Sequence, residues 1–270
     1  MKYNNLFILS NMQKSHLGFG EYLRIASFLP NIKFEKSVWF SCKRLLPILN
    51  EIDYLNKIKN LNQFDISLKH KNDLLLNLTN KKFVLPNTIN INDFSNKQSE
   101  FKKNTKNLLQ LLSDSLKIKK YKIFTNKKTY YKKKIFINWK VPKQWKIKSY
   151  PKAKSQKVIR NIKRKKNIKI EWQKNNGDLR YLIKQIKDSK LVISVVSLSC
   201  HLAILFNKKL ITLSGPNFFD DLNLYKKSKV VFTRKKCSIH KKTMNVKYAR
   251  CNCMKFIDEK EIYKLAVNEI

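Results

Sequence analysis

The stretch that decides the fold is residues 191–216, which read LVISVVSLSCHLAILFNKKLITLSGP. It opens with a short apolar, β-branched run, which predicts a buried strand. Small polar residues interrupt this run, and apolar residues with helical spacing follow at once. A second apolar run, at 210–213, ends at a Ser-Gly-Pro turn signal and predicts another buried strand. Strand, tight turn, helix and strand together indicate a βαβ unit within a parallel sheet.

Polar side chains follow the first predicted strand of this unit. Ligands of open α/β sheets bind at the carboxyl ends of the strands. Ser197, Ser199 and His201 lie at that end in the sequence, so position and residue type together make them candidates for a binding site. A histidine in such a helix is also found as a packed core residue, so the pattern alone leaves both roles of His201 open.

The rest of the chain alternates in the same way between short apolar runs and amphipathic segments. The apolar runs predict further strands, at 6–10, 38–42, 64–68, 74–78, 83–85, 135–139, 168–172 and 230–232. Helical periodicity and end signals predict helices, at 21–29, 45–49, 101–116, 158–162, 179–189 and 258–267. Strands that alternate with helices indicate an α/β fold with parallel sheets.

The predicted elements fall into two domains. A polar, lysine-rich linker at 126–134 separates an N-terminal domain (residues 1–125) from a C-terminal domain (residues 135–270). The C-terminal domain includes a Cys/His-rich loop and a terminal helix. Because ligand pockets occur preferentially between domains, we expect a binding cleft there.

The charge of the chain is strongly positive. The sequence has 59 Lys and Arg against 18 Asp and Glu, a formal net charge of +41. One explanation is a polyanionic partner, such as a nucleic acid, an anionic membrane surface or a phosphorylated glycolipid. The other is a biased codon pool, since Lys, Asn and Ile are all abundant. Nucleic acid is the less favoured partner, because the lysines are spread along the chain and not concentrated on one element with interleaved aromatic residues.

The sequence predicts a cytoplasmic protein. The N-terminal residues show no signal peptide, and no apolar run reaches the length that a bilayer requires. Five cysteines, an odd number, do not resemble a secreted disulfide framework.

Two of the four glycines flank the start of the first predicted helix. Gly18 and Gly20 imply a backbone that turns sharply or approaches a ligand closely. Glu21 follows in the first turn of that helix. A carboxylate is favoured there by the helix dipole alone, so Glu21 has either a structural or a chemical role.

Three segments resemble glycosyltransferase family 9, the heptosyltransferase-like enzymes. Residues 18–24 (GFGEYLR) are similar to the family's N-terminal loop, in which a Gly-Asp pair opens the first helix. Residues 145–151 (WKIKSYP) resemble its Trp-Pro-x-Lys-x-Trp-Pro segment. Residues 196–203 (VSLSCHLA) resemble its Asp-Ser-Gly-x-x-His-x-Ala motif. The resemblance implies a GT-B fold, in which two Rossmann-like domains face each other across a cleft.

The resemblance also implies roles for residues of the N-terminal, acceptor-side domain. The family's catalytic acid position falls on Glu21, which would act as general base on the acceptor hydroxyl. This chemistry requires a carboxylate, which must accept a proton and lie beside a developing oxocarbenium ion. Gly18, Gly20 and Arg24 belong to the same loop and helix start, on the acceptor side.

Other matched positions belong to the C-terminal, nucleotide-sugar-binding domain. Lys148 matches the lysine that contacts the donor pyrophosphate, where a cation stabilises the departing nucleoside diphosphate. Ser197 and His201 match two residues of the family's third motif, and Ser199 lies between them. In this chain Val196 and Leu198 replace the motif's Asp and Gly. Glu171 falls where contacts to the donor ribose arise in such folds.

The resemblance implies an inverting, metal-independent sugar transfer with no required cofactor. The donor would be a nucleotide sugar, ADP-heptose among them, and the acceptor a lipopolysaccharide-type or other glycan. A phosphorylated glycolipid acceptor or a peripheral contact with the anionic inner membrane would suit the basic surface. Two alternatives remain open: a nucleotide-sugar-binding relative that has lost catalysis through Val196 and Leu198, and a basic nucleic-acid-binding protein.

Four soft ligands cluster near the C-terminus. Cys237 and His240 form a Cys-x-x-His pair that fits half of a structural zinc site. Cys251 and Cys253 form a Cys-x-Cys pair, which is tighter than the usual second half. The cluster therefore either holds zinc or consists of reduced cysteines that order a loop. We assign no metal ligands from the sequence.

Overall fold

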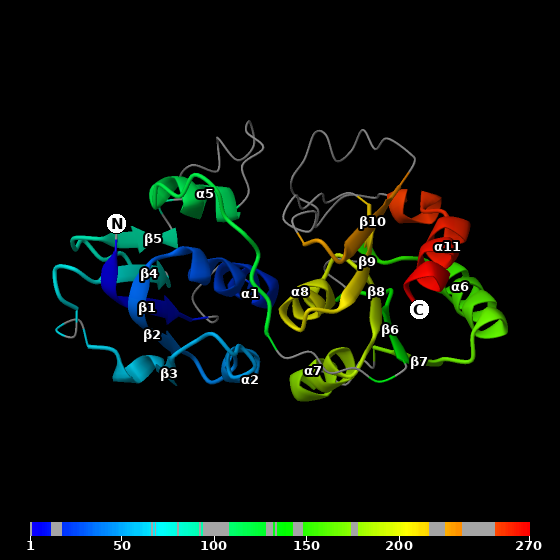
Figure 1. The fold of residues 1–270 in the computed structure, drawn as a ribbon, viewed down its shortest axis with the longest axis horizontal. Coiled ribbons are helices and arrows are strands. Elements are labelled where there is room, and N and C mark those ends of the chain that lie inside the picture. The colour runs from blue at the N-terminus through cyan, green and yellow to red at the C-terminus, as the bar shows by residue number, and fades with distance from the viewer. Residues whose placement is uncertain are drawn as a thin grey trace. The chain divides into compact units, whose positions relative to one another are not determined.

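The computed structural model describes residues 2–11, 18–65, 67, 69–79, 81–91, 93, 108–127, 132, 134–142, 148–173, 178–215, 225–233 and 252–270. Contacts between Cα atoms divide the chain into two compact units, Met1–Asn126 and Lys127–Ile270. Each unit contains a five-stranded parallel sheet with helices packed on it (Figure 1). The predicted α/β class is therefore confirmed.

Unit 1 is a parallel sheet in the Rossmann strand order. Its strands are β1 (Tyr3–Ser10), β2 (Phe34–Ser41), β3 (Lys57–Asn60), β4 (Leu74–Leu78) and β5 (Thr88–Asn90). They are arranged β3-β2-β1-β4-β5, and every pair is parallel. The described helices are α1 (Phe19–Phe28), α2 (Leu46–Leu49) and α5 (Leu108–Ser115), with short 3₁₀ turns at Leu29–Asn31 and Leu61–Gln63. The strand order reverses between β1 and β4.

Two predicted strands of unit 1 are wrong. In the run 64–68, the described residues 64, 65 and 67 form no strand. The Asp65 side chain accepts a hydrogen bond of 2.9 Å from the Ser67 N–H, and such a local turn competes with strand pairing. The run 83–85 is also not a strand. The N–H and C=O of Phe83 bond to the Asn90 side chain, at 3.1 and 2.9 Å, in place of a neighbouring strand.

Unit 2 is a parallel sheet in the flavodoxin-like order. Its strands are β6 (Lys134–Asn138), β7 (Lys169–Trp172), β8 (Leu191–Val195), β9 (Lys209–Ser214) and β10 (Ser228–Phe232), arranged β10-β9-β8-β6-β7. Its helices are α6 (Lys152–Lys165), α7 (Leu179–Lys187), α8 (Leu198–Leu205) and α11 (Glu259–Glu269), with a 3₁₀ turn at Cys253–Phe256. The βαβ unit predicted for residues 191–216 is confirmed as β8, α8 and β9. In this order the sheet has its switch point between β6 and β8, which is where ligands of such folds bind.

Helices cover both faces of the unit 2 sheet. Helices α6 and α11 lie side by side on one face, and α7 and α8 lie on the other (Figure 1). Helix α6 turns its buried apolar residues Val158, Ile159 and Ile162 to the core that α11 and the strands share. Burial of this stripe, at about 25 cal/mol per Å² of apolar surface, is what holds so charged a helix in place.

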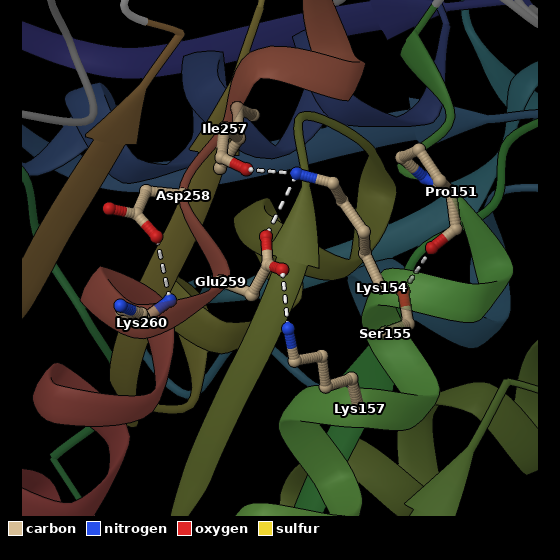
Figure 2. Close-up of polar contacts among 8 residues, drawn as sticks. All are labelled: Pro151, Lys154, Ser155, Lys157, Ile257, Asp258, Glu259 and Lys260. Atoms are coloured by element: carbon tan, nitrogen blue, oxygen red, sulfur yellow. Dashed lines mark hydrogen bonds and ion pairs between the residues drawn. The ribbon is translucent and has the colours of Figure 1, made fainter.

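An ion-pair cluster joins α6 to the start of α11. The Glu259 carboxylate accepts from Lys154 Nζ at 2.8 Å and from Lys157 Nζ at 3.1 Å (Figure 2). Lys154 also donates to the Ile257 carbonyl, at 3.3 Å. The two lysines hold the pKa of Glu259 at about 2, below its usual 4.5, chiefly through the Lys154 hydrogen bond.

Candidate functional site

The carboxyl ends of β6 and β8 meet at the switch point of unit 2. Asn138, the last residue of β6, pairs in register with Ser194 of β8. Both side chains are almost completely buried. The N-cap of helix α8, Ser197, comes three residues after Ser194, so the first turn of α8 lies at the same end of the sheet. The predicted serines of the βαβ unit are thus brought to a ligand-binding position of the fold.

A buried asparagine organises this end of the sheet. Asn138 Nδ2 donates to Ser197 Oγ at 2.9 Å and to Ser199 Oγ at 3.2 Å. Ser197 is the N-cap of α8, and its Oγ accepts from the Ser199 N–H at 3.3 Å. Ser194 Oγ lies 3.1 Å from Ser197 Oγ. We call Asn138, Ser194, Ser197 and Ser199 the serine cluster.

Counting donors gives the direction of the hydroxyl protons in the serine cluster. Ser194 Oγ donates to the Val195 carbonyl at 2.7 Å, which uses its single proton. The proton between the two hydroxyls must therefore come from Ser197. Because Ser197 Oγ also accepts from Asn138 and from the Ser199 N–H, its bonding capacity is used inside the cluster. Ser199 is buried, so an anion at this turn would meet chiefly the amides of the helix N-terminus in place of the Ser197 hydroxyl.

The sequence reasoning missed Asn138 and Ser194. Asn138 lies 59 residues before Ser197, and nothing in the sequence shows that β6 and β8 are neighbours in the sheet. The available signal was positional: Asn138 is a polar residue near the carboxyl end of the apolar run 135–139.

The remaining donor-side candidates lie on α8, on β7 and in the segment before α6. His201 lies on α8, partly buried, one turn after Ser197. Glu171 pairs in register with Phe136, two residues before the end of β6, and its Oε1 is 3.0 Å from Lys169 Nζ. Glu171 is the next-to-last residue of β7, and so lies near the carboxyl end of that strand. Of the two residues that replace the Asp and Gly of the third motif, Val196 is buried and Leu198 is the first residue of α8.

Lys148 lies next to a well-anchored segment. Tyr150, two residues later, is buried, and its N–H donates to the Trp139 carbonyl at 2.8 Å, just beyond the end of β6. Burial raises the pKa of the Tyr150 phenol. Lys148 is partly exposed. Trp145 of the same motif lies outside the described residues.

The end of β9 lies against the 3₁₀ turn Cys253–Phe256. A Cβ atom at Gly215 would overlap the Met254 side chain, so the backbone approaches closely there. Thr233 Oγ1 donates to the Cys253 carbonyl at 2.8 Å, and Cys253 is buried. Its predicted companions Cys237, His240 and Cys251 lie outside the described residues. Among the residues that are described, no group of three or more His, Cys, Asp or Glu could hold a metal ion.

In unit 1, Glu21 holds the start of α1. Its Oε2 accepts a hydrogen bond of 3.0 Å from the N–H of Gly18, the N-cap residue. A Cβ at Gly18 would lie only 3.0 Å from that oxygen, so glycine suits this position. Gly20 lies in the first turn, and Arg24 is buried one turn further along. The structural role left open for Glu21 is therefore present, and its carboxylate is held in one orientation.

No helix in the described part of the chain is long and apolar enough to cross a membrane.

Comparison with known proteins finds likeness at the level of structure. No protein-family model matches the sequence, and no curated protein does. A glycosyl transferase family 9 protein from Veillonella parvula DSM 2008 matches over 100% of this chain and 98% of its own, with 13% identity and a TM-score of 0.62. The E. coli heptosyltransferase WaaC, crystallised with ADP-2-deoxy-2-fluoro heptose, matches over 98% of this chain and 100% of its own, with 10% identity and a TM-score of 0.56.

A third structure, the E. coli ADP-heptose lps heptosyltransferase II, matches over 99% of this chain and 100% of its own, with 9% identity and a TM-score of 0.53. The resemblance to glycosyltransferase family 9 is thus confirmed for the fold, which is that of the GT-B heptosyltransferases. At such identities the likeness concerns the fold alone.

Proposed function

We propose that the chain is a glycosyltransferase that uses a nucleotide-diphosphate sugar, with ADP-heptose as the first donor to test. Its acceptor would be a lipopolysaccharide-type or other glycan. The observation that carries the proposal is the likeness to heptosyltransferases along nearly the whole chain, through both units. We place its action on the cytoplasmic side, in peripheral contact with an anionic membrane that presents a phosphorylated glycolipid.

The serine cluster supports a donor site in unit 2. A nucleoside diphosphate needs N–H and O–H donors and a cation near its pyrophosphate. The α8 N-terminus supplies donors at the switch point, and in this proposal Lys148 is the cation and His201 the ring donor of the matched motifs. Asn138 fixes the turn with two hydrogen bonds, so the helix N-terminus is held in one geometry.

The geometry of Glu21 supports a general base in unit 1. The Gly18 N–H orients Oε2, and among the described residues Oε1 has no hydrogen-bond partner. That second oxygen would take the proton of the acceptor hydroxyl as the hydroxyl attacks the anomeric carbon, with inversion and without a metal. The sugar–phosphate bond breaks in the same step, and its electrons leave with the nucleoside diphosphate.

Val196 favours a second candidate, a relative that binds nucleotide sugars without turnover. It places a buried apolar side chain where the family has an acid. The two functions share a donor site and differ only in the chemical step.

A thermal-shift panel of ADP-heptose, ADP, UDP-glucose and GDP-mannose tests the donor site, because a ligand that binds only the folded state raises the melting temperature. We expect the ADP compounds to give the largest rise. No rise with any nucleotide would contradict both candidates.

The variant Glu21→Gln then tests catalysis. Gln keeps an oxygen that can accept from the Gly18 N–H, as in a capping box, but cannot act as a base. We expect turnover to fall by about 10²-fold or more, with the donor-induced thermal shift unchanged. The matched control is Glu35→Gln, which removes an exposed carboxylate of β2 and should leave turnover as it is. Equal activity of Glu21→Gln and the wild type would exclude Glu21 as base.

A further inference from the structure

Helices α6 and α11 present a surface whose exposed charges are all positive. On both helices every charged residue at an exposed position is Lys or Arg; these are Lys152, Lys157, Arg160, Lys163, Arg164, Lys165, Lys260 and Lys264. The two helices lie side by side on one face of the sheet (Figure 1), so these cations belong to the same side of unit 2. We call this surface the basic face.

Helix α6 has no acidic residue, and the three of α11, which are Glu259, Glu261 and Glu269, are only partly exposed. Glu259 lies in the seam between the helices, bonded to Lys154 and Lys157 (Figure 2). Glu269 pairs with Lys209 and Lys229 of the sheet, at 3.1 and 2.7 Å. Among the described residues, the cations of the basic face other than Lys157 pair with no carboxylate. Their charge is therefore directed outward and left uncompensated.

We propose that the basic face docks the protein on an anionic lipid bilayer. The docking rests on the proposed function, because a lipid-linked acceptor makes a fixed position at the membrane useful. Each Lys or Arg near an anionic leaflet strengthens binding about fivefold at moderate salt. Helix α6 has 14 residues and is about 21 Å long, so its cations reach several headgroups at once. The apolar side of α6 is packed in the core, so docking is electrostatic and needs no insertion.

The same features fit a nucleic acid less well. Proteins that bind single strands stack bases on exposed aromatic side chains, and no exposed residue of α6 or α11 is aromatic. Duplex readers insert a helix or strand into a groove. Here α6 and α11 are both packed on the sheet along their length, and the N-terminus of α11 is capped by Asp258. A surface of exposed cations on two adjacent helices is better matched to a flat array of headgroups.

Three pairs of basic residues, each four positions apart on one helix, give a matched test. Arg160→Gln with Arg164→Gln removes two charges from α6, and Lys260→Gln with Lys264→Gln removes two from α11. The control pair Arg180→Gln with Lys184→Gln removes two exposed charges from α7, on the opposite face of the same sheet. All three variants lose the same net charge from unit 2.

The experiment measures co-sedimentation with vesicles of phosphatidylcholine, with and without phosphatidylglycerol, over a range of NaCl concentrations. We expect the wild type to bind only the anionic vesicles and to be released by salt. The α6 and α11 pairs should each weaken binding by about 25-fold, and the α7 pair by less than about threefold. Circular dichroism and melting curves establish that the variants fold, and the salt titration of the wild type needs no variant.

Three outcomes would overturn the proposal. The wild type could fail to bind anionic vesicles at low salt. The α7 variant could bind vesicles as weakly as the other two, which would show that binding depends on the total charge and not on the basic face. The wild type could bind RNA more tightly than vesicles and lose that binding with Arg160 and Arg164, which would identify a nucleic-acid surface. Because no sugar donor is present, failure here is distinguishable from failure of the glycosyltransferase proposal.

Discussion

At the scale of single residues, the informative feature is an asparagine that no motif identifies. Asn138 donates to two serines that belong to the first turn of α8. Its Oδ1 also accepts from the Lys140 N–H at 3.2 Å, so the amide is held at both ends. A buried side chain with all its hydrogen bonds made can fix one geometry for a neighbouring turn.

Replacement of Asn138 by Leu tests this role. The substitution removes the Asn138 amide, which donates to the hydroxyls of Ser197 and Ser199. Because these hydroxyl oxygens then lose a hydrogen bond, the free energy of unfolding should fall by about 1–3 kcal/mol. We also expect the thermal shift caused by ADP to shrink, because the turn that binds it is no longer fixed. Chemical denaturation and the shift assay measure the two effects.

The control for that variant is Asn268→Leu, at an exposed position of α11. It should change the free energy of unfolding by less than about 0.5 kcal/mol and leave the thermal shift caused by ADP as it is. If Asn138→Leu lowers stability but keeps the full ADP shift, Asn138 supports the fold and not the donor site.

At the scale of elements, an ion-pair cluster decides how the C-terminal helix is attached. Helices α6 and α11 share an apolar core, and the Glu259 cluster closes one end of their contact (Figure 2). Glu259 lies at the first position of α11, where the helix dipole also favours a carboxylate. This arrangement joins α6, which begins four residues after Lys148, to the last helix of the chain.

The variant Glu259→Gln should lower the free energy of unfolding by about 1 kcal/mol at neutral pH. The pKa of Glu259 is lowered in the folded protein, to about 2 from 4.5. Its stabilising effect is thus complete above pH 4.5 and is lost as the pH falls towards about 2. Denaturation curves of the wild type and the variant should differ at pH 7 and converge in acid. If the variant and the wild type differ by the same free energy of unfolding at all pH values, the ionised Glu259 carboxylate is not the cause. The control Glu35→Gln should differ from the wild type by almost nothing at any pH.

At the scale of the whole molecule, the net charge opposes folding. A chain with a formal charge of +41 gains repulsion between like charges when it becomes compact. Few carboxylates are available to offset it: the sequence has 18 Asp and Glu against 59 Lys and Arg. Salt should therefore stabilise this protein more than an ordinary domain.

We expect the melting temperature to rise as NaCl is raised from about 10 mM to about 150 mM, since the Debye length falls from about 30 Å to about 8 Å. Differential scanning calorimetry measures it. Sucrose at equal osmolality serves as the uncharged control, and a melting temperature that falls with NaCl would show that attractive ion pairs outweigh the repulsion.

The sequence by itself determined the features that depend on near neighbours. Residues 191–216 predicted β8, α8 and β9 correctly, because apolar runs, a serine N-cap and turn residues act within a few positions. It also determined the α/β class and the presence of the serines at a strand end. Where local polar bonds compete with strand pairing, as at Asp65 and Phe83, the same reasoning was wrong.

Only the tertiary structure decided which distant residues meet. Strand order brings Asn138 beside Ser194, and thereby completes the serine cluster that 191–216 begins. Packing likewise engaged Glu259 and Glu269 of α11 in ion pairs with lysines of α6 and of the sheet, whereas the composition had shown only an excess of positive charge. A sequence pattern shows which side of a helix or strand is buried. Which other element packs against that side depends on how the complete faces fit together, and this is settled only in the folded chain.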